Sequence, residues 1–515
     1  MTRPSARARA TVVLDGRGLT PPAVAAAARA RASVRLTEAA RARNAEAAAA
    51  TRTLIERGGA LYGATTGVGP FRDHAIAGPD RAEHQLRLLR SHAGGAGDAL
   101  APELVRATMV VRANQIGAGG AGVADELLTA LVAALNAGIV PLVREYGSLG
   151  TGDLSVLAEI ALALLGEGRL WQPDLVGPLA PSDVPAAVRA LRPQQLGPRD
   201  GIAFMSSNAA AIGRAALVSV DVARLSAATL AVAAVSFEAA GADRAVLDPR
   251  VHDARPHPGQ RAAAAQLRAL LGEAPGTGAD QRVGRPIQDP YAFRVVAQVE
   301  GVMSDALVAL ERVLAVELNA AAENALIAGG EALPNGNFHA GALTAALDAL
   351  RAALAQSASL VAGRVSALLD PSLTGLPAML SAEPGVGSGA MMLEYTAHAV
   401  AADVRSLTSP LAAQTTSVAW GVEHHASFTG LAARRTEEAL AAARIAIATE
   451  LVLAVRALRL RGLEPLGDAP RGLFDEAARR ISADMADRPL GDDVEAAREL
   501  LFSDPAQAVG EPSGG

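Results

Sequence analysis

Two residue types are missing from this chain of 515 residues. It has no cysteine, and all 47 basic residues are arginine because the sequence contains no lysine. Without lysine the chain cannot form a Schiff base with pyridoxal phosphate or a carbonyl substrate, and it cannot build a phosphate-binding P-loop. Without cysteine it has no disulfide, thiolate nucleophile, iron–sulfur cluster or cysteine zinc site. Chemistry on an amine or a carbonyl must therefore use an electrophile of another kind.

Aromatic and charged residues are also scarce. Aromatic residues make up 3% of the chain and hydrophobic residues 50%, so the core must consist mainly of alanine, leucine and valine, which suits close-packed helices. Charged residues make up 19%, which is low for a helical protein with a large solvated surface. We therefore expect much of the helix surface to be buried between the subunits of a homo-oligomer.

The bulk properties favour neither a nucleic acid nor a membrane as a partner. The net charge is −6, which does not favour a phosphate backbone. No apolar run reaches the roughly 18 residues of a membrane span, and the arginine-rich start lacks the apolar core of a signal peptide. The nine histidines form neither an HExxH motif nor a compact cluster with carboxylates, so no metal site is predicted. We expect a cytoplasmic protein that acts on a small molecule.

Helical patterns dominate the chain and predict a mainly α fold. The longest alanine- and leucine-rich stretches cover residues 23–58, 343–369 and 431–460, whereas strand patterns are short and scattered. Proline and glycine cluster at 171–200, which predicts a boundary between an N-terminal domain (1–200) and a C-terminal domain (201–515). A second polar stretch, 273–290, is a candidate lid or binding loop.

Several glycine-rich turns stand out. Residues 117–122 fit the pattern GxGxxG, but their flanks look helical, so a close-packed turn between helices is favoured over a dinucleotide site. Tyr62 lies in the glycine-rich turn LYGATTGVGP, and Tyr291 lies beside Arg294 in IQDPYAFR. A further turn, YGSLGTGDL, leads into an apolar helix, for which Asp153 is predicted to be the N-cap.

In order along the chain, these segments resemble the histidine, phenylalanine and tyrosine ammonia-lyase family and its aminomutase relatives. The resemblance runs from about residue 10 to residue 470. Its motifs are LYGATTGVG, LLRSHAGGAG, VVRANQIGAG, YGSLGTGDLSVLAEIALALLGEG, DPRVHDARPHPGQ, IQDPYAFR, ELNAAAENALI, GNFHAG, GVGSGAMM and TSVAWGVEHHAS.

The resemblance implies a fold and a chemistry. The fold would be a long central helical bundle with a smaller N-terminal region of helices and loops that carries the cofactor loop. Four chains would form a homotetramer whose active sites are built from several subunits. The electrophile would come from the chain itself, because an Ala-Ser-Gly triad cyclises and loses two waters to give a methylidene-imidazolone. This group would take the substrate amine while a base removes a β-proton.

The resemblance also implies roles for individual residues. Tyr62 would be the base, Arg294 would hold the substrate carboxylate as a fork with Tyr291 assisting, and His92 would line the side-chain pocket. Glu423 stands where the histidine enzymes keep a pocket carboxylate. Further active-site motif positions are occupied by Gln288, Asn324 and Phe338. The substrate would be an amino acid or another carboxylate.

The sequence departs from the family pattern at the cofactor. Gly150, Thr151 and Gly152 stand where the family has Ala-Ser-Gly, and the loop is one residue shorter. Cyclisation of this triad would give an ethylidene-imidazolone, with a methyl group on the carbon that accepts the amine. Ser206 stands where the family has the asparagine that supports the cofactor, and Asn208 is displaced by two positions.

Three hypotheses follow from these departures. In the first, the protein is an ammonia-lyase or aminomutase with a cofactor made from Thr151. In the second, the cofactor is absent, and Tyr62 drives an elimination, isomerisation, cyclisation or addition on a substrate with a better leaving group or a more acidic proton. In the third, the chain is a non-catalytic paralogue.

Overall fold

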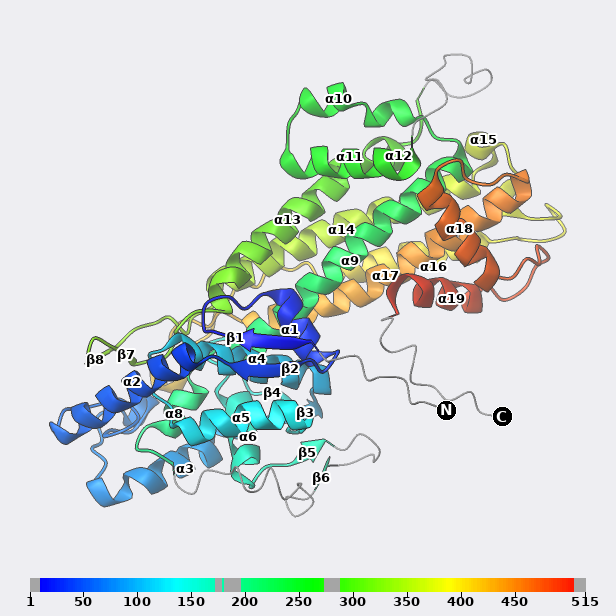
Figure 1. The fold of residues 1–515 in the computed structure, drawn as a ribbon. Helices are drawn as coiled ribbons and strands as arrows, with labels where there is room; N and C mark the ends of the chain where they lie inside the picture. The colour runs from blue at the N-terminus through cyan, green and yellow to red at the C-terminus, as the bar shows by residue number, and fades with distance from the viewer. Residues whose placement is uncertain (1–9, 172–177, 180–195, 273–287, 504–515) are drawn as a thin grey trace, which may run out of the picture. The chain divides into compact units, whose positions relative to one another are not determined.

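The computed structural model describes residues 10–171, 178–179, 196–272 and 288–503, and it confirms the mainly α fold (Figure 1). By its contacts the chain divides into two compact units. The first unit is Met1–Val220, Glu311–Leu347 and Pro410–Arg434, and the second is Asp221–Leu310, Asp348–Ser409 and Arg435–Gly515. The boundary predicted between residues 200 and 201 stays a prediction, because units defined by contacts need not fold independently. Only the last three residues of the candidate loop 273–290 lie within the described residues.

The first unit is centred on a buried helix, α4 (Pro102–Ala118). Every residue of α4 from Leu104 to Gly117 is buried, because α1 (Pro21–Ala28), α2 (Glu38–Glu56) and α5 (Asp125–Ala137) pack around it. Two parallel strands, β1 (Thr11–Leu14) and β2 (Ser33–Leu36), lie side by side in this unit (Figure 1). Its other elements include α3 (Arg81–His92), β3 (Ala96–Ala99), β4 (Arg144–Tyr146), α6 (Leu154–Leu165), β5 (Leu170–Trp171), β6 (Pro178–Leu179), α8 (Asp200–Met205), β7 (Leu326–Ala328) and β8 (Glu331–Leu333).

The GxGxxG segment is a turn between two helices. It begins with the last two residues of α4 rather than after a strand, and Gly119, Gly120 and Gly122 all have positive φ. Gly120 has a φ of +95°, which other residues rarely adopt, and a Cβ atom there would lie 2.3 Å from the Leu326 side chain, so the position favours glycine. The prediction of a close-packed turn is confirmed, and the dinucleotide alternative is wrong.

The second unit contains long stretches of four helices. The unit boundaries fall within these helices, which are α9 (Ala209–Ala240), α13 (Val296–Glu317), α14 (Gly341–Leu369) and α17 (Thr429–Arg461). The shorter helices of this unit are η4 (Arg244–Leu247), α10 (Pro249–Asp253), α11 (Pro258–Leu271), α12 (Tyr291–Arg294), α15 (Pro371–Thr374), α16 (Met391–Ser406), α18 (Asp468–Arg480) and α19 (Gly491–Phe502).

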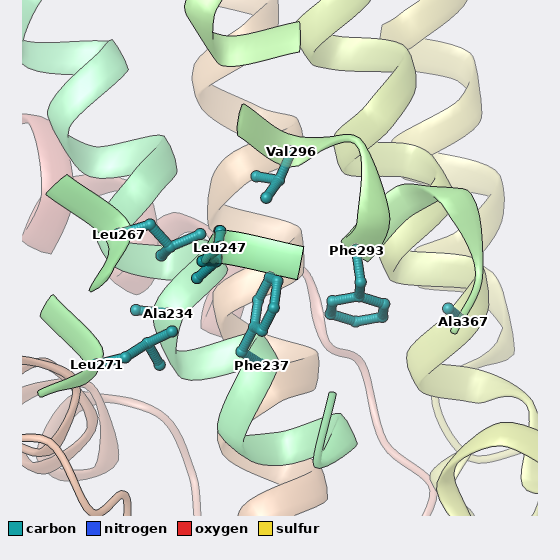
Figure 2. Close-up of a cluster of buried hydrophobic side chains, with 9 residues drawn as sticks. Ala234, Phe237, Leu247, Leu267, Leu271, Phe293, Val296 and Ala367 are labelled. Atoms are coloured by element: carbon teal, nitrogen blue, oxygen red, sulfur yellow. The ribbon is translucent and has the colours of Figure 1, made fainter. Parts of the chain in front are cut away.

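Two phenylalanines lie at the centre of an apolar cluster in the second unit. The rings of Phe237 and Phe293 pack edge to face with centroids 5.2 Å apart, and Leu247, Leu267 and Val296 surround them (Figure 2). Because Phe293 belongs to the four-residue helix α12, this cluster anchors a helix that is too short to be stable by itself.

A buried polar network joins the long helices inside the second unit. Glu450 of α17 accepts hydrogen bonds from Ser236 of α9 at 2.7 Å and from Arg364 of α14 at 2.7 and 2.9 Å. Ser357 of α14 donates to Glu300 of α13 at 2.8 Å. The Arg364 and Glu450 side chains are both fully buried, so neither charge is solvated by water and each is stabilised by the other.

Two segments have the length and mean composition of a membrane span, although neither is an uninterrupted apolar run. They are Asp200–Ala240 and Gly341–Leu369, and 56% and 67% of their most apolar windows are buried inside the protein. Core helices of folded domains pass the same test, so these helices are weak evidence for a membrane protein.

Candidate active site

The tyrosine of the first glycine-rich turn is held by backbone contacts. Tyr62 follows α2, and its hydroxyl accepts a hydrogen bond from the Gly69 N–H at 2.9 Å. The same turn is closed by Thr65, whose Oγ accepts from the Leu61 N–H at 2.7 Å, and it is tied to α3 by Gln85, which donates to the Gly63 carbonyl at 2.7 Å.

Tyr62 is in its protonated form near neutral pH. Burial raises the pKa of its phenol above the usual value, and the negative charge of Glu423 adds to this effect. The Gly69 hydrogen bond and the positive charge of Arg72 act in the opposite direction on that pKa. The Glu423 carboxylate and the Tyr62 phenol therefore interact electrostatically.

The predicted cofactor loop is held at three points. The Gly150 carbonyl accepts from the Ser427 hydroxyl at 2.7 Å, and the Gly152 N–H donates to Asn208 Oδ1 at 3.0 Å. Between these two glycines, the Thr151 hydroxyl donates to Glu423 Oε2 at 2.8 Å. The structure thus brings together Thr151 and Glu423, which are 272 residues apart in the sequence.

Asp153 is the N-cap residue of α6 by position, but its side chain forms a hydrogen bond with another helix, α9. Its carboxylate makes no capping bond to α6; it accepts instead from the Ala211 N–H in the first turn of α9 at 2.8 Å and from the Ser148 hydroxyl at 2.7 Å. The prediction that Asp153 caps α6 through its side chain is therefore wrong. Burial raises the pKa of this fully enclosed carboxyl, whereas the bonds from Ala211 and Ser148 lower it.

Two residues directly after α8 were candidates for supporting the cofactor loop, and only the second of them contacts it. Ser206, which stands at the family's asparagine position, accepts from the Asn324 N–H at 3.1 Å. Asn208, two residues further on, contacts the loop at Gly152, and its amide N–H also donates to the Phe338 carbonyl. Asn208 rather than Ser206 therefore supports the loop, and the positions Asn324 and Phe338 lie beside this pair.

A buried ion pair that the sequence analysis missed supports this arrangement. Arg112 of α4 donates to Glu323 at 3.0 Å and to the Phe204 carbonyl at 2.9 Å, and both charged side chains are 1% exposed or less. It thereby joins the end of α8 to the segment that carries Asn324. The sequence pattern that could have revealed it is the arginine inside the apolar stretch MVVRANQIG, in a chain with few charges.

Ser427 is a second residue that the sequence analysis missed. Its side chain is buried, and besides Gly150 it contacts the hydroxyl of Thr429 at 2.7 Å. The next residue, Phe428, donates its N–H to the Leu149 carbonyl at 2.9 Å. No local pattern marks these contacts, because they join segments that are almost 280 residues apart.

The remaining predicted residues have other surroundings. His92 ends α3, and its ring contacts Leu88 and Ser91 of the same helix. Gln288, Tyr291 and Arg294 belong to the second unit. The Arg294 guanidinium lies 5.0 Å above the ring of Tyr291, which is 72% exposed. Among the described residues there is no group of three or more histidine or acidic side chains that would hold a metal ion.

Comparison with known proteins identifies the family. Residues 19–479 match the family model of the aromatic amino acid lyases. The histidine ammonia-lyase of Symbiobacterium thermophilum is 36% identical over 493 residues, which cover 95% of this chain and 96% of that protein. The chain belongs to the aromatic amino acid lyase family. It is an enzyme of the C–N lyase type represented by ammonia-lyases and aminomutases.

Solved structures of this family share the fold. The tyrosine aminomutase of Streptomyces globisporus has a TM-score of 0.89 and 29% identity, over 95% of this chain and 96% of that one. Ergothionase from Treponema denticola, an ergothioneine-degrading enzyme, has a TM-score of 0.88 and 26% identity, over 97% of this chain and 100% of that one. Relatives with this fold thus carry the names of different substrates.

The loop contacts do not suit the imidazolone that the resemblance implies. Ring closure would remove the Gly150 carbonyl oxygen, the Gly152 N–H and the Thr151 hydroxyl, and each of these groups has a hydrogen-bond partner here. The partners Ser427, Asn208 and Glu423 would lose those bonds. The methyl group of Thr151 would in addition crowd the carbon that has to accept the amine.

Proposed function

We propose that this lyase eliminates an amine from, or moves it within, an amino acid, and that Tyr62 is the base that takes the proton from the substrate carbon. The observation that carries the proposal is the Tyr62–Glu423 pair in the first unit, at positions that match the motifs of ammonia-lyases. A phenol and a carboxylate whose charge acts on it can serve as a pair for proton transfer.

The protonation state of Tyr62 defines the role of Glu423. A phenol that holds its proton has to release it before, or while, it accepts one from carbon. The Glu423 carboxylate is the neighbouring acceptor, so the carbon-bound proton goes to the Tyr62 oxygen and the phenol proton goes to Glu423. The C–H electron pair forms the new double bond, and the C–N pair leaves with the amine.

The other family positions would bind the substrate. Arg294 would hold its carboxylate as a two-pronged donor, with Tyr291 assisting. We propose His92, Gln288, Asn324 and Phe338 as residues of the substrate pocket. The names of the relatives make histidine, tyrosine and ergothioneine the first substrates to test.

The test is a comparison of Tyr62→Phe with the unmodified protein. Release of the amine and formation of the unsaturated product are measured on L-histidine, L-tyrosine, L-phenylalanine and ergothioneine. Loss of the phenol oxygen should lower kcat/KM on the substrate that is turned over by about 100-fold or more. Tyr146→Phe, which changes an exposed tyrosine of β4 and keeps its ring, is the matched control and should leave the rate unchanged.

Two outcomes contradict the proposal. If Tyr62→Phe retains the full rate, Tyr62 is not the base. If the unmodified protein releases no amine from any of the four compounds, the non-catalytic alternative is favoured instead.

A further inference from the structure

We propose that residues 150–152 remain an ordinary peptide in the working enzyme, and that Thr151 is a positioning residue whose hydroxyl fixes the Glu423 carboxylate. The positioning part of this inference rests on the proposed function, because it presupposes the Tyr62–Glu423 pair.

The first step of the argument is the atom balance of ring closure. The Gly152 nitrogen would attack the Gly150 carbonyl carbon, and the first water would carry away the Gly150 oxygen with the hydrogens of the Gly152 and Thr151 nitrogens. The second water would carry away the Thr151 hydroxyl with its Cα hydrogen. Each of the three hydrogen-bonding groups that are bound in the site would therefore be lost.

The second step concerns the partners of those groups. Ser427 and Asn208 are buried side chains that bond the two ends of the triad at 2.7 and 3.0 Å. Ring formation would take the acceptor from Ser427, which would keep its contact with Thr429, and the donor from Asn208 Oδ1, and losing a partner is costly for a buried polar atom. The site is thus complementary to the open peptide.

The third step concerns Glu423 itself. It ends a tight turn that begins at Val418, whose N–H donates to the Glu423 carbonyl at 2.9 Å, while the side chain is only partly buried. A partly exposed carboxylate on a turn can adopt several rotamers, but the bond of 2.8 Å from Thr151 fixes one of its oxygens. Thr151 thereby fixes the position of the negative charge that acts on the Tyr62 phenol.

An enzyme without the imidazolone needs a different kind of substrate. The amine cannot be activated by bonding to the protein, so it must leave as a neutral amine from a nitrogen that already carries a positive charge. The proton that Tyr62 removes must also be acidified by a neighbouring group of the substrate. The α-ammonium group of an ordinary amino acid meets the first condition but its β-proton is barely acidic, so we expect a substrate whose β-proton is acidified by a neighbouring group.

The intact mass of the purified full-length protein tests the first part. We expect the mass that the sequence predicts, with no near-ultraviolet band beyond that of the aromatic residues. A mass lower by one or two waters would show ring closure and overturn the inference. That result would leave the proposed amine elimination intact, because it concerns only how the amine is activated.

An ultraviolet titration of the phenol tests the positioning role without any substrate. The groups that act on Tyr62 are Glu423, Arg72 and the Gly69 N–H. Subtracting the titration of Tyr62→Phe from that of the unmodified protein isolates the Tyr62 phenol. In Thr151→Val, which keeps the shape but loses the hydroxyl, Glu423 is released and Tyr62 should titrate at a lower pH. Thr151→Ser restores the hydroxyl and should restore the titration of the unmodified protein.

Each result of the titration decides the point. A Tyr62 titration that is the same in Thr151→Val and in the unmodified protein overturns the positioning role. A shift that Thr151→Ser does not reverse does so as well, because the hydroxyl is then not its cause. Circular dichroism of each variant over the same pH range confirms that the titrated protein is folded.

Discussion

At the scale of single residues, the proton on Tyr62 controls the expected pH dependence. Because burial and the charge of Glu423 raise the pKa of the phenol, almost no phenolate is present near neutral pH. If Glu423 accepts the phenol proton, Glu423→Gln should lower kcat/KM at neutral pH by at least about tenfold. The variant then depends on free phenolate, so its rate should rise about tenfold per pH unit towards the pKa of the phenol, which burial keeps above the usual tyrosine value of about 10. A pH–rate profile parallel to that of the unmodified protein would contradict this role.

Gly150 has a conformation and surroundings that only glycine tolerates. Its φ is +83°, and a Cβ atom would lie 2.2 Å from Ser427 Oγ and 2.9 Å from the Phe428 nitrogen. Gly150→Ala should therefore lower the free energy of unfolding by about 2–4 kcal/mol, through backbone strain and overpacking together. Gly58→Ala is the matched control, because Gly58 has a similar φ of +78° but open space around it. Urea unfolding measures both, and equal losses would show that the contact with Ser427 has no cost.

At the scale of helices and strands, the first turn of α9 donates a hydrogen bond to a carboxylate at the start of a different helix, α6. Asp153 accepts the Ala211 N–H in the first turn of α9, so Asp153→Ala should destabilise the protein by about 0.5–2 kcal/mol.

The raised pKa of Asp153 also predicts the sign of a pH effect. The folded state favours the protonated carboxyl, so the stability it contributes is present below the unfolded pKa of about 4 and is lost as the pH rises through the folded pKa. Asp153→Asn does not titrate, so it should gain stability relative to the unmodified protein as the pH rises over this window. Denaturant unfolding at a series of pH values measures the difference, and a constant difference would contradict the prediction.

The pair Arg364–Glu450 is a fully buried polar link between the long helices α14 and α17 of the second unit. Arg364→Met removes one charge and leaves Glu450 buried without its partner, which should cost about 3–5 kcal/mol. Replacing both residues with methionine should recover part of that loss, because Glu450 is then no longer left as a buried carboxylate without Arg364. The control is Arg498→Met, which breaks an exposed pair on α19 and should cost less than about 1 kcal/mol. A double variant that is less stable than Arg364→Met would refute this account.

At the scale of the whole molecule, assembly remains the main expectation to be tested. We propose a homotetramer, on the basis of the family resemblance, the low charge content and the exposed apolar residues of the single chain. Met392 and Tyr395 of α16 are 65% and 63% exposed and lie on the same side of the helix because they are three residues apart. Large apolar side chains in such a position are typical of subunit contacts.

Mass photometry can test that assembly. The unmodified protein should have about four times the chain mass of 52.2 kDa. The double substitution Met392→Glu with Tyr395→Glu should give smaller species, because it would bury two charges in a contact. Ala49→Glu places a charge on an exposed position of α2 and is the control. A monomeric unmodified protein, or a double variant that assembles fully, would contradict the prediction.

The sequence by itself determined two kinds of feature: those that depend on residues a few positions apart, and the order of motifs along the chain. The spacing of alanine and leucine indicates helices because each helix is stabilised by contacts a few residues apart, and the order of the motifs identifies the family and the residue types of its site. The tertiary structure decided which of these residues meet. Three hydrogen bonds show this, because they join segments 58 to 277 residues apart. They are the bonds from Thr151 to Glu423, from Ser427 to Gly150 and from the α9 residue Ala211 to Asp153. Such contacts depend on how helices pack, and helix packing leaves no repeating pattern in the sequence around a single serine or threonine.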